Sequence, residues 1–554
     1  MEAVAQGGRE SFPQIVTCPH EMVAMSMADG FARLTGEPQC VLVHVDVGTQ
    51  MLGCAMHNAS VARCPVLVFA GLSPFTLEGE MRGSRTEYIH WLQDAPDQKQ
   101  IVAQYCRYTA EIKTGKNIKQ MVNRALQFAT SDPKGPSYLV GAREVMEEAI
   151  TPYDLDLDSW TNVAPAALPP FAVEETVSLL ASAQSPLIIT GYSGRNHATV
   201  PQLVALAESI PGIKVLDALG SDVCFPYTHR SSLGVRIGRD QSITDADVIL
   251  VLDCDVPWIP TQCQPRKDCK VVHVDVDPLK PGMAVHYIPA FRRYRADSET
   301  ALRQLNAYIA STEEYSRLPE TEPYASRWVR LAKSREDSLA DIANRAAPPK
   351  AKADPPSASH LCSKLREACP GGTIWCVEAV TNAMAVYDQL QVDKPGHLVN
   401  AGGGGLGWSG GGTLGVKLAS DWKAGGTGKG NFVCSIVGDG TFLFGVPGTA
   451  YWIAMRYEIP TLTVVLSNKG WNAPRNSVTL VHPDGCAARQ SSEELNISFA
   501  PVPDYSGIAK SAAGGSAWAY IVRNVYDLEK ALPEAVRQVQ GGVSAILEVR
   551  LSQF

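Results

Sequence analysis

The amino-acid sequence predicts an α/β protein built from three doubly wound parallel sheets. Its 554 residues are enough for about three domains. Short runs of β-branched residues alternate with helical segments in each third of the chain, which is typical of parallel sheets with helices on both faces. Proline-rich stretches at 165–170 and 346–359 separate these thirds. We therefore expect a first domain at 1–152, a central domain at 168–330, a linker at 346–359 and a third domain at 360–554.

The composition is that of a globular protein, with 45% hydrophobic and 19% charged residues. The net charge of −8 argues against a nucleic-acid-binding surface. No apolar stretch is long enough to cross a membrane, and the first residues lack the apolar core of a secretion signal. The 14 cysteines are scattered, and those within strand-like runs, such as Cys40 and Cys434, are expected to be buried, reduced thiols. These features predict a cytoplasmic protein.

The first domain shows strand-like runs at Gln39–Val45 and Pro65–Ala70 and a helical pattern at Lys116–Thr130. Another helix is expected to begin at Glu21. Its buried face would carry Met22, Met25 and Met27. A carboxyl group against an apolar wall favours its protonated form, which suits a residue that transfers protons near neutrality. The alternative is an exposed glutamate that the helix dipole favours at the first turn.

A second group of polar side chains follows the strand at 39–45, in the segment HVDVGTQ that covers residues 44–50. His44 is a candidate general acid or base because imidazole titrates near neutral pH. It could equally be a histidine whose polar atoms are satisfied at the end of a strand. The sequence also offers weaker candidates in His20, His57 and His90.

The central domain repeats the alternation, with strand-like runs at Pro186–Thr190, Val248–Leu252 and Val271–Val276. Gly191 and Gly194 would allow a nucleotide-binding turn after the first of these runs. The full glycine fingerprint G-x-G-x-x-G does not follow any strand, so bound FAD or another nucleotide is possible but disfavoured.

The third domain contains the most informative stretch, residues 431–476. An apolar run ends at a Gly-Asp-Gly turn around Asp439, a helix follows at about 446–457, and a second apolar run ends just before Asn468. Both residues therefore fall at the carboxyl ends of predicted parallel strands, where ligands bind. A carboxylate, an amide oxygen and a backbone carbonyl are the hard oxygen ligands that Mg²⁺ uses. The alternative is an ordinary βαβ turn.

Four motifs, taken in order, resemble those of the thiamin diphosphate-dependent enzymes, in particular the acetolactate synthase-like and benzoylformate decarboxylase-like members. They are HE-x-x-A-x-x-x-ADG-x-AR at Glu21, HVDVGTQ at His44, GGLGW within the glycine run Ala401–Gly415, and GDG followed by Asn468. The resemblance covers nearly the whole chain. It implies three domains that bind the pyrimidine ring, form a Rossmann-like centre and bind the diphosphate.

The resemblance also assigns roles to residues. Glu21 would activate the cofactor, and His44 would act as acid or base. Mg²⁺ would be held by Asp439, Asn468 and the carbonyl of Gly470. The remaining cofactor contacts would come from Thr381, Asn382, Gly404, Leu406, Gly438, Gly440 and Thr441. The substrate side of the pocket would be formed by Asp46, Gln50, Trp471 and Asn472, with Gln93 as a looser candidate.

By the same resemblance, the predicted function is a carboligase that joins a decarboxylated 2-oxo acid, such as pyruvate, to a second carbonyl. The alternatives are a non-oxidative 2-oxo acid decarboxylase and a subunit that binds the cofactor without activity. An NAD-type dehydrogenase is disfavoured because no acidic residue follows a proper fingerprint. Family members place the activating glutamate and the metal site on opposite subunits, so a homodimer or homotetramer is expected. The match starts near Met1, so the first sheet is expected to lack its opening strand.

Overall fold

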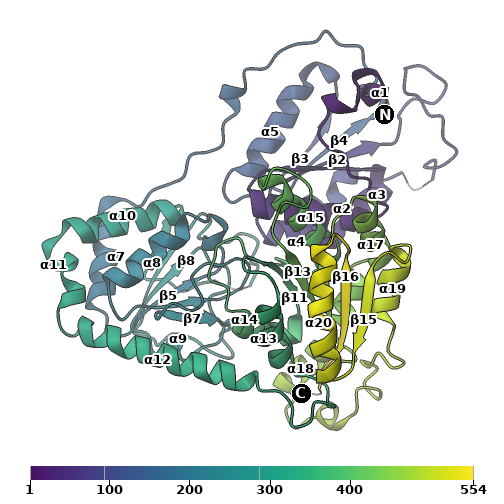
Figure 1. Ribbon diagram of the computed structural model, residues 1–554. Helices are drawn as coiled ribbons and strands as arrows, with labels where there is room; N and C mark the ends of the chain where they lie inside the picture. Colours follow the sequence, from purple (N-terminus) through teal and green to yellow (C-terminus); the bar gives the residue numbers. More distant parts are fainter. Residues whose placement is uncertain (1, 93, 286, 553–554) are drawn as a thin grey trace.

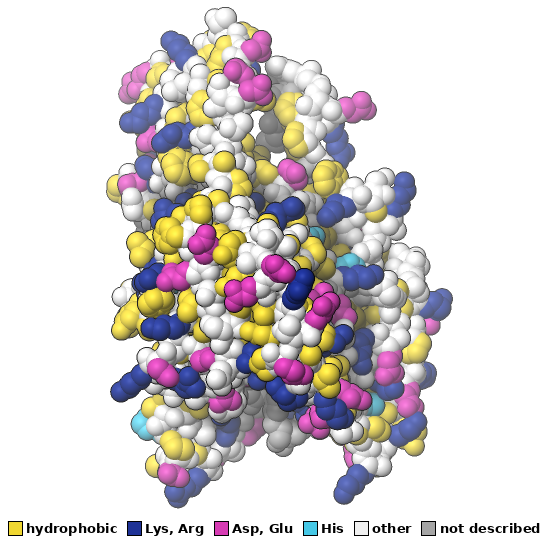
Figure 2. All heavy atoms as spheres, turned by 90° about the vertical axis from the view of Figure 1, so that its left-hand side faces the viewer, with side chains coloured by type: hydrophobic (Ala, Val, Ile, Leu, Met, Phe, Trp, Pro, Cys, Tyr) yellow, Lys and Arg dark blue, Asp and Glu magenta, His cyan; other side chains and the backbone are white. Residues whose placement is uncertain are grey.

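The computed structural model describes residues 2–92, 94–285 and 287–552 and contains three parallel sheets, which confirms the predicted fold class. Figure 1 shows the first sheet at the top, the central sheet at the lower left and the third sheet at the lower right. None of the helices that these residues form is long and apolar enough to span a membrane. Figure 2, which faces the central domain, shows basic and acidic side chains interspersed.

The first sheet has four described strands in the order β1-β2-β4-β3, all parallel. The strands are β1 (Gln39–Val43), β2 (Val66–Leu72), β3 (Tyr108–Ile112) and β4 (Ser137–Ala142). Its main helices are α2 (Glu21–Thr35), α3 (Val45–Met51), α4 (Gly53–Val61) and α5 (Ile118–Thr130). Helix α2 begins at Glu21 as predicted, and its three methionines are buried. Cys40, however, is exposed, because β1 is an edge strand that also leaves Leu42 uncovered.

The central sheet has six strands in the order β10-β9-β8-β5-β6-β7. The strands are β5 (Pro186–Thr190), β6 (Lys214–Asp217), β7 (Ser232–Val235), β8 (Val248–Leu252), β9 (Lys270–Asp275) and β10 (Arg292–Arg295). Helices α7 (Pro170–Ser182), α8 (Thr199–Ser209), α9 (Gln241–Asp245) and α10 (Ser298–Ser311) pack around it. The long α12 (Tyr324–Arg345) then leads towards the third domain (Figure 1).

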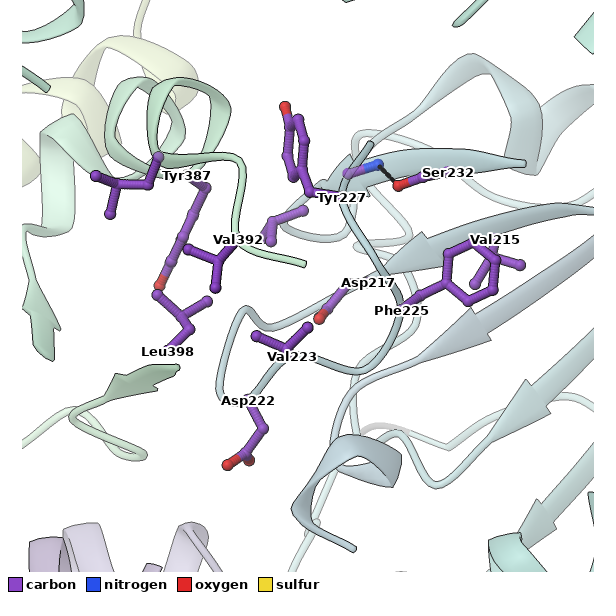
Figure 3. Close-up of a pocket in the computed structure, with 13 residues that line it drawn as sticks. Val215, Asp217, Asp222, Val223, Phe225, Tyr227, Ser232, Tyr387, Val392 and Leu398 are labelled. Carbon is purple, nitrogen blue, oxygen red and sulfur yellow. Dashed lines mark hydrogen bonds between the residues drawn. The ribbon is translucent and has the colours of Figure 1, made fainter. Parts of the chain in front are cut away.

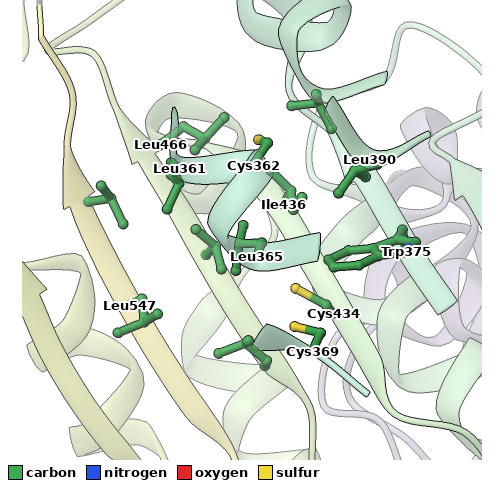
Figure 4. Close-up of a cluster of buried hydrophobic side chains, with 14 of the residues drawn as sticks. Leu361, Cys362, Leu365, Cys369, Trp375, Leu390, Cys434, Ile436, Leu466 and Leu547 are labelled. Atoms are coloured by element: carbon green, nitrogen blue, oxygen red, sulfur yellow. The ribbon is translucent and has the colours of Figure 1, made fainter. Parts of the chain in front are cut away.

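The third sheet has six strands in the order β12-β11-β13-β14-β16-β15. The strands are β11 (Ile374–Glu378), β12 (Leu398–Asn400), β13 (Val433–Gly438), β14 (Leu462–Ser467), β15 (Trp518–Val522) and β16 (Ala545–Arg550). Its helices are α13 (Ala358–Ala368), α14 (Ala383–Leu390), α15 (Trp408–Lys423), α16 (Asp439–Phe444), α17 (Pro447–Arg456), α18 (Asn472–Val481), α19 (Tyr505–Ala512) and α20 (Val525–Gln540). Figure 4 shows its largest core cluster, in which α13 packs on the sheet through Leu361 and Leu365, beside the buried thiol of Cys434.

Two segments differ from the sequence-based expectation. The strand expected at 39–45 ends at Val43, and residues 45–51 form helix α3. The second part of the glycine run is helical, because it forms the first half of α15, which packs against α2. A Cβ on Gly411 would lie 2.4 Å from the carbonyl oxygen of Val23, and one on Gly415 would lie 2.0 Å from that of Met27. These glycines therefore allow the two backbones to approach closely, a tertiary role that local sequence does not reveal.

Candidate functional site

The carboxyl ends of four neighbouring strands of the third sheet form one edge. The strand order β12-β11-β13-β14 brings together four segments that are distant in sequence. The glycine-rich loop at 401–407 follows β12, Thr381 follows β11, Asp439 follows β13 and Asn468 follows β14. Chain connectivity reverses between β11 and β13, and such a switch point is where open α/β sheets bind ligands.

Three oxygen groups converge at this edge. The side-chain oxygen of Asn468 lies 3.0 Å from the carbonyl oxygen of Gly470 and 3.2 and 3.3 Å from the two carboxylate oxygens of Asp439. The amide nitrogen of Asn468 instead donates to the hydroxyl of Thr381, at 3.2 Å. These oxygens are all hydrogen-bond acceptors, so they repel one another when no proton lies between them. The repulsion is relieved if a cation binds between them, or if the Asn468 amide rotates so that its nitrogen faces the other oxygens. Adjacent oxygens around an octahedral Mg²⁺, at about 2.1 Å from the ion, lie about 3 Å apart.

The Asp439 carboxylate is held rigidly. It is 3% exposed, and it accepts the N–H groups of Gly440 (2.8 Å) and Lys469 (2.9 Å). Burial raises its pKa to about 6, against the opposing effect of these N–H donors. No group of three or more His, Cys, Asp or Glu side chains in the described part of the chain could hold a metal. The set around Asp439 contains one carboxylate only, and its chemistry fits Mg²⁺ with a bound phosphate group.

Two buried side chains clamp the glycine-rich loop on either side of Leu406. The amide of Asn58, on α4, donates to the carbonyl of Gly405 (2.7 Å) and accepts its N–H (2.9 Å). The carboxylate of Glu378, at the end of β11, accepts the N–H groups of residues 407, 408 and 409 at the start of α15. Burial raises the pKa of Glu378 to about 7. The half-buried Leu406 is thus held between two fixed points.

Sequence reasoning missed both clamping residues. Glu378 carries a signal in hindsight, because it is an acidic residue at the carboxyl end of a predicted strand. Asn58 carries none, because its partners lie 347 residues away. The same helix also supplies His57, whose Nε2 accepts the N–H of Gly404 at 3.2 Å.

Trp471 and Asn472 lie beside the oxygen cluster. The indole ring of Trp471 covers the Gly438–Gly440 turn, since a Cβ on Gly440 would lie 2.4 Å from it. The ring also packs against Phe444 and Phe499, with centroids 5.9 and 4.9 Å away. The side-chain nitrogen of Asn472 lies 3.4 Å from the carbonyl oxygen of Gly470. Near the strand ends, Asn382 and Thr441 are buried, and the side-chain oxygen of Asn382 has no hydrogen-bond partner among the described residues.

The predicted acid–base residues gather on the first sheet. Glu21 rests against the start of α3, where a Cβ on Gly48 would lie 3.2 Å from its Oε1. His44 immediately precedes α3 and is exposed, Asp46 is buried in its first turn, and Gln50 donates to Asp46 Oδ2 at 3.3 Å. Gln93 lies outside the described residues.

The structure does not bring Glu21 onto the oxygen cluster of its own chain. Thr17, which precedes Glu21 on the same segment, donates its N–H to the hydroxyl of Tyr457 at 2.8 Å. Tyr457 follows the last residue of α17, and this helix is about 15 Å long. Within the described chain, no hydrogen bond or ion pair joins the Glu21 carboxylate to any other residue. The Glu21 carboxylate and the oxygen cluster are therefore not joined by any hydrogen bond or ion pair within the described part of one chain.

The crevice at the carboxyl ends of the central sheet does not fit FAD. The guanidinium of Arg63, from the first domain, fills it and pairs with the carboxylates of Asp253, Asp255 (2.7 Å) and Asp275 (3.5 Å). Its charged plane stacks on the ring of Tyr192, 4.5 Å from the centroid. Lys280 also pairs with Asp255 (2.6 Å) and Asp275 (2.5 Å), so charged side chains that pair with one another already occupy these strand ends.

Gly191 and Gly194, the two glycines of the expected nucleotide-binding turn, are also packed against other protein atoms. A Cβ on Gly191 would lie 2.8 Å from the side chain of Leu219, and one on Gly194 would lie 2.2 Å from the carbonyl oxygen of Val223. These glycines therefore make room for the loop after β6 rather than for a phosphate.

A small pocket lies between the central and third domains, lined by residues of both (Figure 3). Its polar groups already have protein partners. Asp222 pairs with Arg195 at 2.9 Å, and the hydroxyl of Tyr227 donates to Asp388 at 2.5 Å. We interpret this pocket as part of the seam between the domains.

Comparison with protein families gives three matches along the chain. Residues 3–101 match the N-terminal TPP binding domain of thiamine pyrophosphate enzymes, residues 173–305 match their central domain, and residues 379–549 match their C-terminal TPP binding domain. Thiamine pyrophosphate is the compound called thiamin diphosphate above.

Known relatives are similar at low identity. A probable acetolactate synthase large subunit from Methanocaldococcus jannaschii is 23% identical, over 81% of this chain and 73% of the relative. A benzoylformate decarboxylase from Pseudomonas aeruginosa is 23% identical, over 82% of this chain and 79% of the relative. Among solved structures, the thiamine diphosphate-dependent 4-hydroxybenzoylformate decarboxylase of Rhodococcus jostii superposes with a TM-score of 0.75 at 21% identity, over 97% of this chain and 92% of that one.

Proposed function

This chain belongs to the thiamine pyrophosphate-dependent enzymes, and we propose that it is a carboligase that joins a decarboxylated 2-oxo acid to a second carbonyl compound. The observation that carries the proposal is the convergence of the Asp439 carboxylate, the Asn468 amide and the Gly470 carbonyl at one edge of the sheet, next to the clamped glycine loop. The cluster fits Mg²⁺ and the diphosphate of the cofactor. The acetolactate synthase relative supports carboligation as the outcome.

The residues of the third domain bind and orient. Asp439, Asn468 and the carbonyl of Gly470 hold Mg²⁺, which neutralises the diphosphate, while Thr381 fixes the amide of Asn468. The carbonyl of Gly404 would accept a hydrogen bond from the cofactor's amino group, and Leu406 would pack against the cofactor and orient its two rings. When bound, thiamin diphosphate supplies the nucleophilic carbon that makes decarboxylation of a 2-oxo acid feasible.

The residues of the first domain move protons. Glu21 holds a proton at the ring nitrogen of the cofactor's aminopyrimidine, and His44 transfers protons to and from the substrate. Because the Glu21 carboxylate forms no hydrogen bond or ion pair with the described part of its own chain, we propose that it serves the cofactor bound to a second copy. A homodimer is then the smallest active unit, and a homotetramer would contain two such pairs.

The test of this function is to incubate the protein with thiamin diphosphate, Mg²⁺ and a panel of 2-oxo acids, beginning with pyruvate. We expect acetolactate-type products from two substrate carbonyls. Absence of turnover with every donor and acceptor would contradict the proposal.

The second candidate is a non-oxidative decarboxylase, favoured by the similarity to benzoylformate decarboxylase. Free aldehyde as the main product, with an aromatic or aliphatic 2-oxo acid, would favour this candidate. A third outcome, cofactor binding without exchange of its C2 proton, would identify an inactive cofactor-binding subunit. Calorimetry measures the binding, and NMR measures the exchange.

A further inference from the structure

A third titratable side chain lies beside His44 and Asp46. The imidazole of His90 has its ring centroid 5.6 Å from that of His44, and its Nδ1 lies 3.5 Å from Oδ1 of Asp46. Neither the cofactor motifs nor the substrate-pocket candidates include His90. It comes from the segment after β2, whereas His44 and Asp46 come from the turn after β1, so the fold brings the three groups together from neighbouring strand ends.

The backbone around His90 is built to turn this side chain inward. Its neighbours Tyr88, Ile89, Trp91 and Leu92 are all more than half exposed, but the His90 side chain is only 16% exposed. His90 has a φ of +64°, which is unfavourable for a residue with a side chain. Arg85 supports this conformation by donating to the carbonyl of His90 at 2.6 Å and by stacking on Trp91. Strain of this kind concentrates at functional sites.

The Asp46 carboxylate has one oxygen to spare for His90. Its Oδ2 accepts the amide of Gln50, but its Oδ1 is buried without a hydrogen-bond partner in the described structure. An unpaired buried carboxylate oxygen is costly, so a donor is expected within reach. The Nδ1 of His90 can be that donor, because hydrogen bonds between catalytic groups are often long before substrate binds. Val45, between His44 and Asp46, has a φ of +40°, so this side of the cluster is also strained.

We propose that His90 is a second acid–base residue of the substrate pocket, held by Asp46 and working beside His44. The inference rests on the proposed function and deepens it. A bond from Nδ1–H to Asp46 fixes the tautomer, so that Nε2, which has no partner among the described residues, is the atom that exchanges protons. Asp46 is then a positioning residue, and it acts only through His90.

The reaction takes up one proton, and a group of this kind can supply it. Decarboxylation of a 2-oxo acid releases CO₂ and takes up one proton, which goes to the aldehyde carbon. In carboligation, the one proton goes instead to the acceptor carbonyl oxygen, which becomes the product hydroxyl. Nε2–H of a protonated histidine supplies that proton, and solvent restores it. With two histidines, one can exchange protons with the donor 2-oxo acid and the other with the acceptor carbonyl compound.

The variants His90→Asn, His90→Ala and Asp46→Asn test the proposal. Asparagine can keep the contact with Asp46 while losing the proton exchanged at Nε2. We expect His90→Asn to lower kcat about 100-fold, with KM, cofactor affinity and C2-proton exchange changed less than about 3-fold. Added imidazole should restore part of the activity of His90→Ala. Asp46→Asn should lower kcat about 10-fold alone and have no further effect in the His90→Asn background.

The matched control is His397→Asn. His397 is also a partly buried histidine with a neighbouring carbonyl, but it lies at the amino end of the third sheet. We expect its kcat to match that of the wild type. Wild-type kcat in His90→Asn, no rescue of His90→Ala by imidazole, or an undiminished Asp46→Asn effect in the double variant would each overturn the role of His90. Absence of turnover by the wild-type protein would instead overturn the proposed function as well.

Discussion

The two groups of site residues differ in how completely one chain pairs their polar atoms. In the third domain, the Asp439 carboxylate accepts two N–H groups, Glu378 accepts three, and Asn58 makes both of its possible bonds to Gly405. In the first domain, Glu21 makes no hydrogen bond or ion pair to the described chain, and one buried oxygen of Asp46 accepts no hydrogen bond from it, with Nδ1 of His90 3.5 Å away.

This difference indicates what each region is prepared to meet. The third domain is preorganised to anchor a ligand, because its clamps are in place before anything binds. The acid groups of the first domain have unused bonding capacity, which a cofactor and substrate anchored on another copy would satisfy. Exposed apolar side chains lie close by in both regions, among them Met51, Phe75 and Trp91 in the first domain and Phe444 in the third. Substitutions in the third domain should therefore affect cofactor binding, and substitutions in the first domain should affect proton transfer.

The largest effect is expected from Glu21→Gln. The substitution removes the exchangeable carboxyl proton and keeps the shape, so C2-proton exchange of bound cofactor should slow about 1000-fold. Cofactor affinity should change less than about 3-fold, because the anchor lies elsewhere. NMR exchange and calorimetry measure the two quantities. The control Glu37→Gln alters an exposed glutamate just beyond the other end of α2 and should leave both at wild-type values. A large loss of cofactor affinity in Glu21→Gln would contradict the view that the first domain transfers protons and the third domain anchors the cofactor.

The reverse pattern is expected for Asp439→Ala. Loss of a direct metal ligand should weaken Mg²⁺-dependent cofactor binding by more than about 100-fold. Removing Mg²⁺ from the wild-type protein with a chelator should have a similar effect. Asp247 is a suitable control, because its carboxylate also accepts two backbone N–H groups but lies in the central domain. If Asp439→Ala and Asp247→Ala bind the cofactor equally well, the assignment of Asp439 as a metal ligand is contradicted.

A smaller effect is expected from Leu406→Ala. In the proposed function the uncharged leucine only shapes the cofactor, so turnover should fall about 10-fold through misplacement of the reacting atoms, with affinity nearly unchanged. Steady-state kinetics and calorimetry separate these effects. Unchanged turnover would show that the bend of the cofactor is set by other residues.

The smallest effect on the site is expected from Asn58→Ala. Loss of two buried hydrogen bonds to Gly405 should lower the free energy of unfolding by about 2 kcal/mol. Cofactor affinity should fall only a few-fold, since Glu378 still holds the other end of the loop. Thermal unfolding in the presence and absence of cofactor measures both. An unchanged free energy of unfolding would show that the loop does not depend on α4.

Local patterns in the sequence were sufficient for strands such as β2, β5, β8 and β9, for the start of α2 at Glu21 and for the positions of Asp439 and Asn468 after their strands. Local patterns were not sufficient where contacts between distant segments determine the structure. The glycines at the start of α15 are a packing surface for α2, and Cys40 is exposed because β1 is an edge strand. Asn58 and Arg63 act on partners in other domains, which no local pattern encodes.

The central claim is that Glu21 of one copy activates the cofactor held by Asp439 of another. Mixing inactive Glu21→Gln and Asp439→Ala proteins, after dissociation and reassociation, tests it directly. A mixed dimer then has one site with both substitutions and one with neither, so we expect activity to reappear at about a quarter of the wild-type level for random pairing of equal amounts. If the two residues act within one chain, every site carries a defect, and a mixture as inactive as its components would contradict the account.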